Sequence, residues 1–279
     1  MIIEFEELVF NVLLPESENP HNKIPIVFLH GYTGNANDWQ FVIKNLPERF
    51  FPIAIDLIGH GKSSSPDEVK KYTAGAQIIY LEKILNELEI NSFILVGYSM
   101  GGRFALTYAM KHQAKIIALV LESTAFGYKT TKEKEERILS DKKLSEQIKG
   151  MPLKDFFEFW YDAGLFNSLR KSENIFLQNL KQEKSKSNNK TGLANSLIGF
   201  GTGTMKNYFP VIKNFSKNVL LITGELDTKF TKIATEAKNI FPNAEHKIIS
   251  NCGHNVHLEK PEEFIKFLNR FLLNIKEEK

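Results

Sequence analysis

The stretch VGYSMGGRFALTYA, residues 96–109, places a serine between glycines, after an apolar run and before a helical pattern. Its Gly97, Ser99 and Gly101 match GxSxG, the pattern of a nucleophile elbow, in which small residues allow a turn sharp enough to raise the serine hydroxyl above a sheet. The following helix would direct its dipole and free N–H groups at that hydroxyl, which favours negative charge there. The same residues also fit a glycine-rich turn that only joins a strand to a helix. The pattern of the remaining sequence is needed to distinguish a nucleophile elbow from a simple connecting turn.

Short β-branched runs recur along the chain and predict buried strands. These runs are IPIVFLH (24–30), FFPIAIDL (50–57), SFILVG (92–97), KIIALVLES (115–123), NVLLITGE (218–225) and EHKIISN (245–251). Their continuous apolarity predicts a mostly parallel sheet, and the helical patterns between them predict flanking helices. The N-terminal IIEFEELVFNVLL would add antiparallel edge strands, and Pro261 suits the start of a last helix. Together with the elbow, this order predicts an α/β-hydrolase fold.

The strand–helix alternation stops between residues 126 and 213, which are charged, helical in pattern and without strand signals. We predict that this segment is an inserted helical cap and that residues 1–125 and 214–279 form the core. Within the cap, the basic run KQEKSKSNNK (181–190) fits a bridge between helices or, more simply, a solvated loop.

Composition excludes several classes of protein. The 279 residues are 42% hydrophobic and 25% charged, and a net charge of +3 is spread over both signs, which gives no support to a nucleic-acid partner or a polybasic membrane patch. No apolar run approaches the ~20 residues that span a bilayer. Cys252 is the only cysteine, and MIIEFEELVF lacks the features of a secretory peptide, so we expect a cytoplasmic protein. The histidines lack metal-ligand spacing, and we expect no metal and no nucleotide cofactor.

A catalytic serine needs a base, and histidine is the usual one. His254, in NCGHNVH between the last strand and the last helix, is positioned to bend over the sheet edge. His257 is better explained as a packing or helix-entry residue. The remaining histidines considered belong to turns or to the surface: His30, His60, His112 and His246.

The base in turn needs a carboxylate, which in this fold class lies between the serine and the histidine in chain order. Asp227, in GELDTKF just beyond a strand, is the predicted acid, and its competitors are Glu225 and Glu122. We prefer Asp227 because it lies further into the loop, where its side chain can turn toward the histidine.

Two backbone amides are the expected donors of an oxyanion hole: Met100 N–H after the serine and Tyr32 N–H in HGYTGNANDW. The glycines at 31 and 34 would let that loop approach a ligand closely. A tight strand-ending turn would require the same glycines.

Several of these motifs together resemble the 2-succinyl-6-hydroxy-2,4-cyclohexadiene-1-carboxylate synthase (MenH) family of menaquinone biosynthesis, and the resemblance runs nearly end to end. The motifs are HGYTGNANDW, DLIGHGKS, GYSMGGR, FWYDAGLF, LIGFGTG, GELDTKF and CGHNVHLEKP. The elements HG, GxSxG and GH within them are shared by the whole superfamily, whereas GYSMGGR, the GTG at the exit of the cap and ELDTKF are more particular. The resemblance implies a cofactor-independent lyase that eliminates pyruvate from a ring bearing three carboxylates.

Such a substrate requires cations around the serine. Arg103, one helical turn after the serine, matches an arginine of the family. Arg137 also matches a substrate-binding arginine, although the pattern alone predicts a solvated side chain in a charged helix. Lys186 stands where the family has arginine, and a lysine cannot reproduce the bidentate contact to a carboxylate. Tyr98 and Trp160 are predicted walls of the pocket, with cap core as the alternative for Trp160.

Two other functions fit the same residues. A hydrolase would use the triad for covalent attack on a carbonyl, whereas the lyase uses it for proton abstraction. A ligand-binding protein could keep the fold without turnover, but an intact set of Ser99, Asp227 and His254 argues against it.

Overall fold

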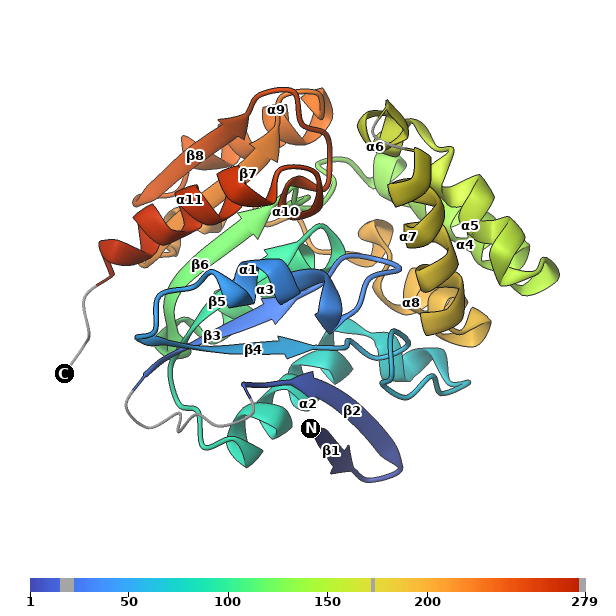
Figure 1. The fold of residues 1–279 in the computed structure, drawn as a ribbon, viewed down its shortest axis with the longest axis horizontal. Coiled ribbons are helices and arrows are strands. Elements are labelled where there is room, and N and C mark those ends of the chain that lie inside the picture. Colours follow the sequence, from blue (N-terminus) through green and yellow to red (C-terminus); the bar gives the residue numbers. More distant parts are fainter. Residues whose placement is uncertain (16–22, 172–173, 276–279) are drawn as a thin grey trace.

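The computed structural model describes residues 1–15, 23–171 and 174–275, which form one eight-stranded sheet with helices on both faces (Figure 1). The strand order across the sheet is β1-β2-β4-β3-β5-β6-β7-β8. The strands are β1 Ile2–Phe5, β2 Leu8–Leu13, β3 Ile24–Leu29, β4 Phe50–Ile55, β5 Phe93–Tyr98, β6 Ile116–Glu122, β7 Asn218–Gly224 and β8 Ala244–Ile249. The first two strands pair antiparallel and the others run parallel, which confirms the predicted sheet.

The strand order reverses at β3, which has β4 on one side and β5 on the other. In open α/β sheets, ligands bind beyond the carboxyl ends of the strands at such a switch point. The register pairs Leu29 with Gly97, so the loop after β3 and the serine turn after β5 leave the sheet side by side. The topology therefore brings HGYT and GYSM together although they are far apart in the sequence.

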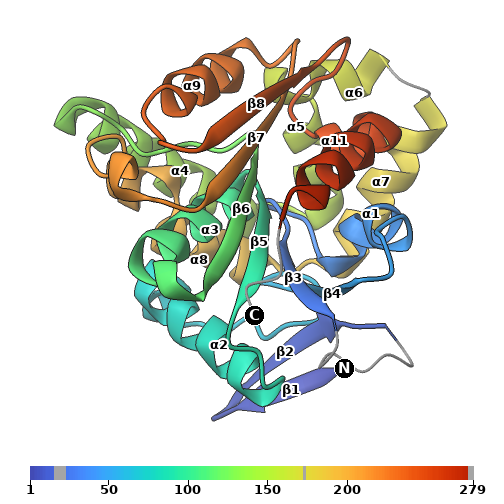
Figure 2. The same cartoon turned by 90° about the vertical axis from the view of Figure 1, so that its left-hand side faces the viewer.

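Helices cover both faces of the sheet, as Figure 2 shows, with α2, α3 and α9 on one face and α1 and α11 on the other. These helices are α1 Gln40–Lys44, α2 Ala74–Glu87, α3 Met100–Lys111, α9 Thr228–Lys238 and α11 Pro261–Leu273, and α10 Val256–Glu259 precedes the last. Each face has its own apolar cluster, which contains Leu81 and Phe104 on the first face and Trp39 and Leu268 on the second. Pro261 lies at the start of α11, as predicted.

A group of helices lies beyond the carboxyl edge of the sheet, at the right of Figure 1, and we call these helices the cap. They are α4 Thr131–Gly150, α5 Leu153–Tyr161, α6 Asn167–Lys171, α7 Asn174–Ser187 and α8 Lys190–Phe200. Phe156, Phe157 and Leu193 belong to a third apolar cluster, and Tyr32 of the core packs against it. The cap therefore has a small core of its own, directly above the loop that follows β3.

The interpretation of residues 181–190 as a solvated loop is wrong. Residues up to Ser187 continue α7, and Lys181 and Lys184 are 8% and 2% exposed. Positions three apart share one helix face, so both lysines turn inward, where they form ion pairs with Glu158 and Asp38. The sequence lacked the apolar spacing that normally marks a buried helix face.

None of the helices in the described part of the chain is both long and apolar enough to span a membrane.

Candidate active site

The turn after β5 has the strained geometry of an elbow. Ser99 has φ 50° and ψ −103°, a conformation that non-glycine residues rarely adopt. A Cβ on Gly97 would lie 2.5 Å from the carbonyl oxygen of Gly101, and one on Gly101 would lie 2.2 Å from that of Leu29. Both glycines of the pattern are thus required by close backbone contacts, and the turn raises Ser99 at the end of a buried strand.

The structure brings the three predicted triad residues into one hydrogen-bonded chain. His254 Nε2 lies 3.0 Å from Ser99 Oγ, and His254 Nδ1 lies 2.6 Å from Asp227 Oδ2. Because a carboxylate only accepts, Nδ1 carries the proton and Nε2 is free to accept the serine hydroxyl. His254 is 1% exposed and Asp227 8%, so the chain is shielded from water. This arrangement can activate the hydroxyl as a nucleophile or as a base.

The other carboxylates considered from the sequence have different partners. Asp227 Oδ1 accepts the N–H of Phe230, which fixes the side chain at the start of α9. Glu225 is exposed and accepts the N–H of Asn251. The geometry thus favours Asp227 over Glu225 as the acid.

Glu122 and His257 form a second, buried carboxylate–imidazole pair. Glu122 is fully buried, and its Oε2 lies 2.7 Å from His257 Nδ1. The His257 ring stacks on Trp39 with ring centroids 4.1 Å apart. Since neither residue lines the pocket above Ser99, His257 has the packing role that the sequence suggested.

The predicted oxyanion donors are both available. Met100 is the first residue of α3, and no acceptor among the described residues takes its N–H or that of Tyr32. The loop that carries Tyr32 lies close to β5, because a Cβ on Gly31 would be 2.5 Å from the ring of Tyr98. Two free amides at the serine can stabilise an oxygen that develops negative charge.

Tyr98 itself is not a wall of the pocket, in contrast to the prediction. Its ring is 7% exposed and packs against His254 and His257, with centroid separations of 5.4 and 5.0 Å. Tyr98 is the last residue of β5 and belongs to the apolar cluster that also contains Trp39 and Leu268. Tyr98 supports the histidine and the Tyr32 loop from below.

A pocket of about 100 Å³ lies above the serine, between the core and the cap. Its lining includes most of the predicted site residues: Tyr32, Ser99, Met100, Arg103, Arg137, Trp160 and His254. Trp160 is both a pocket wall and part of the cap core, because its ring lies 5.1 Å from that of Tyr32 and 5.9 Å from that of Phe156. The two interpretations of this tryptophan are therefore compatible.

Two guanidinium groups make the pocket cationic. Arg103 is 7% exposed, donates to the carbonyl oxygen of Phe200 at 2.7 Å and lies over its ring. Burial, with the charge of Arg137 nearby, lowers the pKa of Arg103 to about 9. The two guanidinium groups share the single carboxylate of Asp141, so one positive charge is left for an anionic ligand to balance.

Sequence reasoning missed the partner of Arg137. Arg137 Nε donates to Asp141 Oδ1 at 2.7 Å, and burial raises the pKa of this carboxyl above its usual value. Asp141 also explains the first glycine of the GTG motif, because a Cβ on Gly201 would lie 2.3 Å from Asp141 Oδ2. The signal was the four-residue spacing of Arg137 and Asp141 on a helix.

Lys186 is not part of this site, in contrast to the prediction. It is exposed on α7 and faces a separate polar hollow, shared with Lys154 and Gln182. Because Lys184 turns inward, a residue two positions further along the helix turns away from the core. The position at which the resemblance implies a substrate-binding arginine thus carries a lysine that points to solvent.

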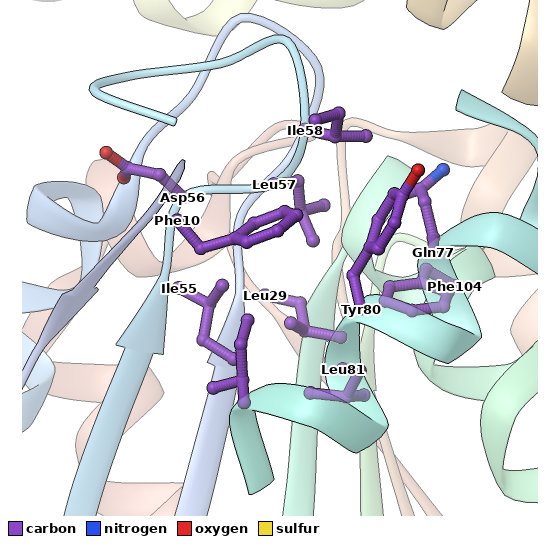
Figure 3. Close-up of a pocket in the computed structure, with 11 residues that line it drawn as sticks. Phe10, Leu29, Ile55, Asp56, Leu57, Ile58, Gln77, Tyr80, Leu81 and Phe104 are labelled. Atoms are coloured by element: carbon purple, nitrogen blue, oxygen red, sulfur yellow. The ribbon is translucent and has the colours of Figure 1, made fainter. Parts of the chain in front are cut away.

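A second cavity lies inside the core of the described residues. Figure 3 shows an apolar cavity between α2 and the sheet, lined by Phe10, Leu57, Tyr80 and Phe104 among others, which measures only about 10 Å³. That volume is close to the minimum for a single water molecule. Within residues 1–15, 23–171 and 174–275, no three His, Cys, Asp or Glu side chains are grouped so that they could hold a metal ion.

Comparisons with known proteins show the fold and the family of this chain. The family model for the alpha/beta hydrolase fold matches residues 24–261. A Bacillus subtilis (strain 168) protein assigned as a 2-succinyl-6-hydroxy-2,4-cyclohexadiene-1-carboxylate synthase is 38% identical over 92% of this chain and 93% of its own. The enzyme of that name from Enterobacter sp. (strain 638) is 31% identical over 90% and 93%.

Solved structures give the same result. The structure of MenH from S. aureus superposes with a TM-score of 0.86 at 31% identity and covers 95% of this chain and 97% of that one. An esterase from Thermogutta terrifontis, at 19% identity, reaches 0.82 over 96% and 94% of the two chains and shows the shared fold alone.

The sheet, the elbow and the matched model define an α/β-hydrolase-fold protein. Within that class, identity of 31–38% over nine-tenths of the chain is decisive. The chain belongs to the 2-succinyl-6-hydroxy-2,4-cyclohexadiene-1-carboxylate synthase family.

Proposed function

We propose that this protein is a lyase that eliminates pyruvate from 2-succinyl-5-enolpyruvyl-6-hydroxy-3-cyclohexene-1-carboxylate and leaves the 2,4-cyclohexadiene. The observation that supports it best is a hydrogen-bonded Ser99–His254–Asp227 chain that opens into a pocket with two arginines. A hydrolase needs the first feature, but a substrate with several carboxylates also needs the second. Family membership points to the same reaction.

Ser99 serves as the base in this mechanism. The carbon next to the succinyl ketone gives its proton to Ser99 Oγ as the serine hydroxyl proton moves to His254 Nε2, 3.0 Å away. Asp227 stabilises the resulting imidazolium. The electron pair moves through the ring double bond and breaks the carbon–oxygen bond at the other end, and His254 gives its proton to the departing oxygen. The released enolpyruvate then tautomerises to pyruvate.

The two free amides stabilise the intermediate charge. Removal of the proton places negative charge on the ketone oxygen, and the N–H groups of Tyr32 and Met100 are the donors at the serine. One donor of this kind typically contributes about 10²–10³ in rate. Arg103 and Arg137 bind carboxylates and keep the breaking bonds aligned.

A hydrolase is the second candidate, because the free amides and the short Ser99–His254 distance also suit acyl transfer. It would form a covalent acyl-enzyme at Ser99, whereas the lyase forms none. A non-catalytic ligand-binding protein would need neither the strained serine nor the aligned histidine.

The proposal also covers the ligand, the cofactor requirement and the cellular compartment of the enzyme. The partner is a small polycarboxylate, and the two arginines, Ser99 and His254 meet the chemical needs of the reaction without a cofactor. A substrate with several charges does not cross a bilayer unaided, so we place the enzyme in the cytoplasm. The net charge of +3, spread over both signs, gives no support to a nucleic-acid partner.

The test is to incubate the purified protein with this substrate and to follow pyruvate and the diene absorbance together, with mass spectrometry of Ser99. Equal and rapid formation of both products without an adduct supports the lyase. An acylated Ser99, or ester turnover that outpaces pyruvate release, identifies a hydrolase instead.

A further inference from the structure

The end of α7 is tied to the loop after β3 by a buried ion pair. Lys184 Nζ contacts Asp38 Oδ1, and the side chains of these residues are 3% and 17% exposed. The other oxygen of Asp38 accepts the N–H of Asn35, which closes the capping box at the start of the short helix Ala36–Trp39. The ion pair therefore joins a cap helix to a fixed point of the loop that carries Tyr32.

A second contact holds the strained residue of the same loop. Thr33, directly after Tyr32, has φ 68°, which is unfavourable for a β-branched residue. Its carbonyl oxygen accepts Asn188 Nδ2 at 3.0 Å, and the same amide group donates to the carbonyl oxygen of Lys184. Strain of this kind persists only where the surroundings fix it, and here the surroundings belong to the cap.

The phenol of Tyr32 is also attached to the cap, because its hydroxyl donates to the carbonyl oxygen of Leu193 in α8 at 3.1 Å. The residue that carries the predicted oxyanion amide is thus held on both sides by cap elements. None of these contacts touches the pocket cations, so their effect on chemistry has to pass through the loop.

We propose that Lys184 and Asn188 are positioning residues that hold the Tyr32 N–H in the oxyanion hole, so that docking of α7 completes the catalytic site. This inference rests on the proposed function, in which the Tyr32 amide stabilises the enolate. It assigns a role to the basic run 181–190 that no catalytic or substrate contact explains.

The chain offers a matched control on the same helix. Lys181 is also buried and ion-paired, but its partner Glu158 lies on α5, so this pair joins two cap helices and does not contact the loop. Lys181→Met removes a buried charge from α7 as Lys184→Met does. A difference between the two variants therefore reports the contact with the loop and not the stability of the helix.

The experiment measures turnover in Lys184→Met, Asn188→Leu and Lys181→Met. A donor used only in the transition state changes kcat and kcat/KM together, so the first two variants should lose at least 10-fold in kcat with KM within about 3-fold of wild type. Lys181→Met should keep kcat within about 3-fold. Thermal unfolding of all three variants checks that stability does not explain the ranking.

A second readout is independent of the natural substrate. A fluorophosphonate forms a P–O bond to Ser99 Oγ with loss of fluoride, and its phosphoryl oxygen occupies the oxyanion hole. Labelling should slow at least 10-fold in Lys184→Met and Asn188→Leu but not in Lys181→Met.

The two proposals fail in different ways. A wild-type protein that is labelled but releases no pyruvate refutes the lyase, and the labelling rates still decide the role of α7. Rates in Lys184→Met and Asn188→Leu equal to those of Lys181→Met would overturn the positioning role. If Lys184→Met does not fold, Asn188→Leu decides alone.

Discussion

Replacement of Asp227 by asparagine tests the triad with little change in structure. The aspartate accepts the Nδ1–H of His254 at 2.6 Å and caps α9 by accepting the N–H of Phe230. Asparagine is as good a helix cap as aspartate, so α9 should remain folded. Its amide, however, can donate to Nδ1, which favours the tautomer with the proton on Nε2.

That tautomer cannot accept the hydroxyl proton of Ser99, and no imidazolium is stabilised. Loss of an aligned triad carboxylate typically costs about 10⁴ in kcat, or ~5 kcal/mol of transition-state stabilisation. We expect this loss in the rate of pyruvate release at pH 7, with a melting temperature within a few degrees of wild type.

Two other carboxylates serve as controls for Asp227→Asn. Glu225 is exposed, so Glu225→Gln should change kcat less than about 2-fold. Glu122 is fully buried against His257, so Glu122→Gln should lower the melting temperature while leaving kcat much closer to wild type. The assignment of the acid is refuted if Glu225→Gln is the slow variant and Asp227→Asn is close to wild type.

Four further predictions concern the site and the buried charges. Ser99→Ala and His254→Ala should each lower kcat by several orders of magnitude, and the double variant should fall little further, because the two residues act as a unit. Arg103→Met should raise the free energy of the transition state by about 2–5 kcal/mol if the guanidinium pairs with a desolvated carboxylate, whereas a kcat/KM within 5-fold of wild type would exclude that pairing. Asp141→Asn should raise KM about 10-fold with less effect on kcat, because Arg137 loses a charged hydrogen-bond partner; an unchanged KM would argue against this orientation. Burial lowers the pKa of His60 to about 3. The neutral imidazole therefore contributes to the free energy of unfolding above pH 6.5, and this contribution falls by about 1.4 kcal/mol per pH unit as the pH drops toward 3. Urea unfolding at pH 5 and 7 should show a smaller pH dependence of this free energy in His60→Gln than in wild type.

The core of the site was predictable because each triad residue lies in a short motif next to a strong strand signal. Buried parallel strands are recognised in the sequence as continuous β-branched runs, and their carboxyl ends lie at one edge of the sheet. Ser99, Asp227 and His254 all follow such runs. The position of each residue after a strand thus predicted that the three side chains lie at the same edge of the sheet. The need of a serine for a base, and of that base for a carboxylate, predicted which side chains form hydrogen bonds.

The side chains that were misplaced depend on which way an element faces. Tyr98 precedes the serine, but it ends a strand whose alternate residues point to opposite faces, so its ring lies below the site. Lys186 and Lys184 are two residues apart on one helix, so only one of them can face the core. A motif match identifies a residue in the chain but does not determine the direction in which its side chain points.

The buried lysines of α7 show why the cap was harder to predict than the core. A core helix is recognised by its apolar stripe, whereas the inward face of α7 includes lysines whose charge is balanced by carboxylates on other elements. Asp38 is 146 positions away from Lys184, and nothing local in either stretch indicates that the two will meet. A buried charge is tolerated only where its partner is already in place, so each such lysine marks a contact that depends on the whole fold. At Lys184 that contact joins the cap to the short helix that follows the Tyr32 loop, so a stretch of sequence that looks like a solvated surface is a buried contact between cap and core.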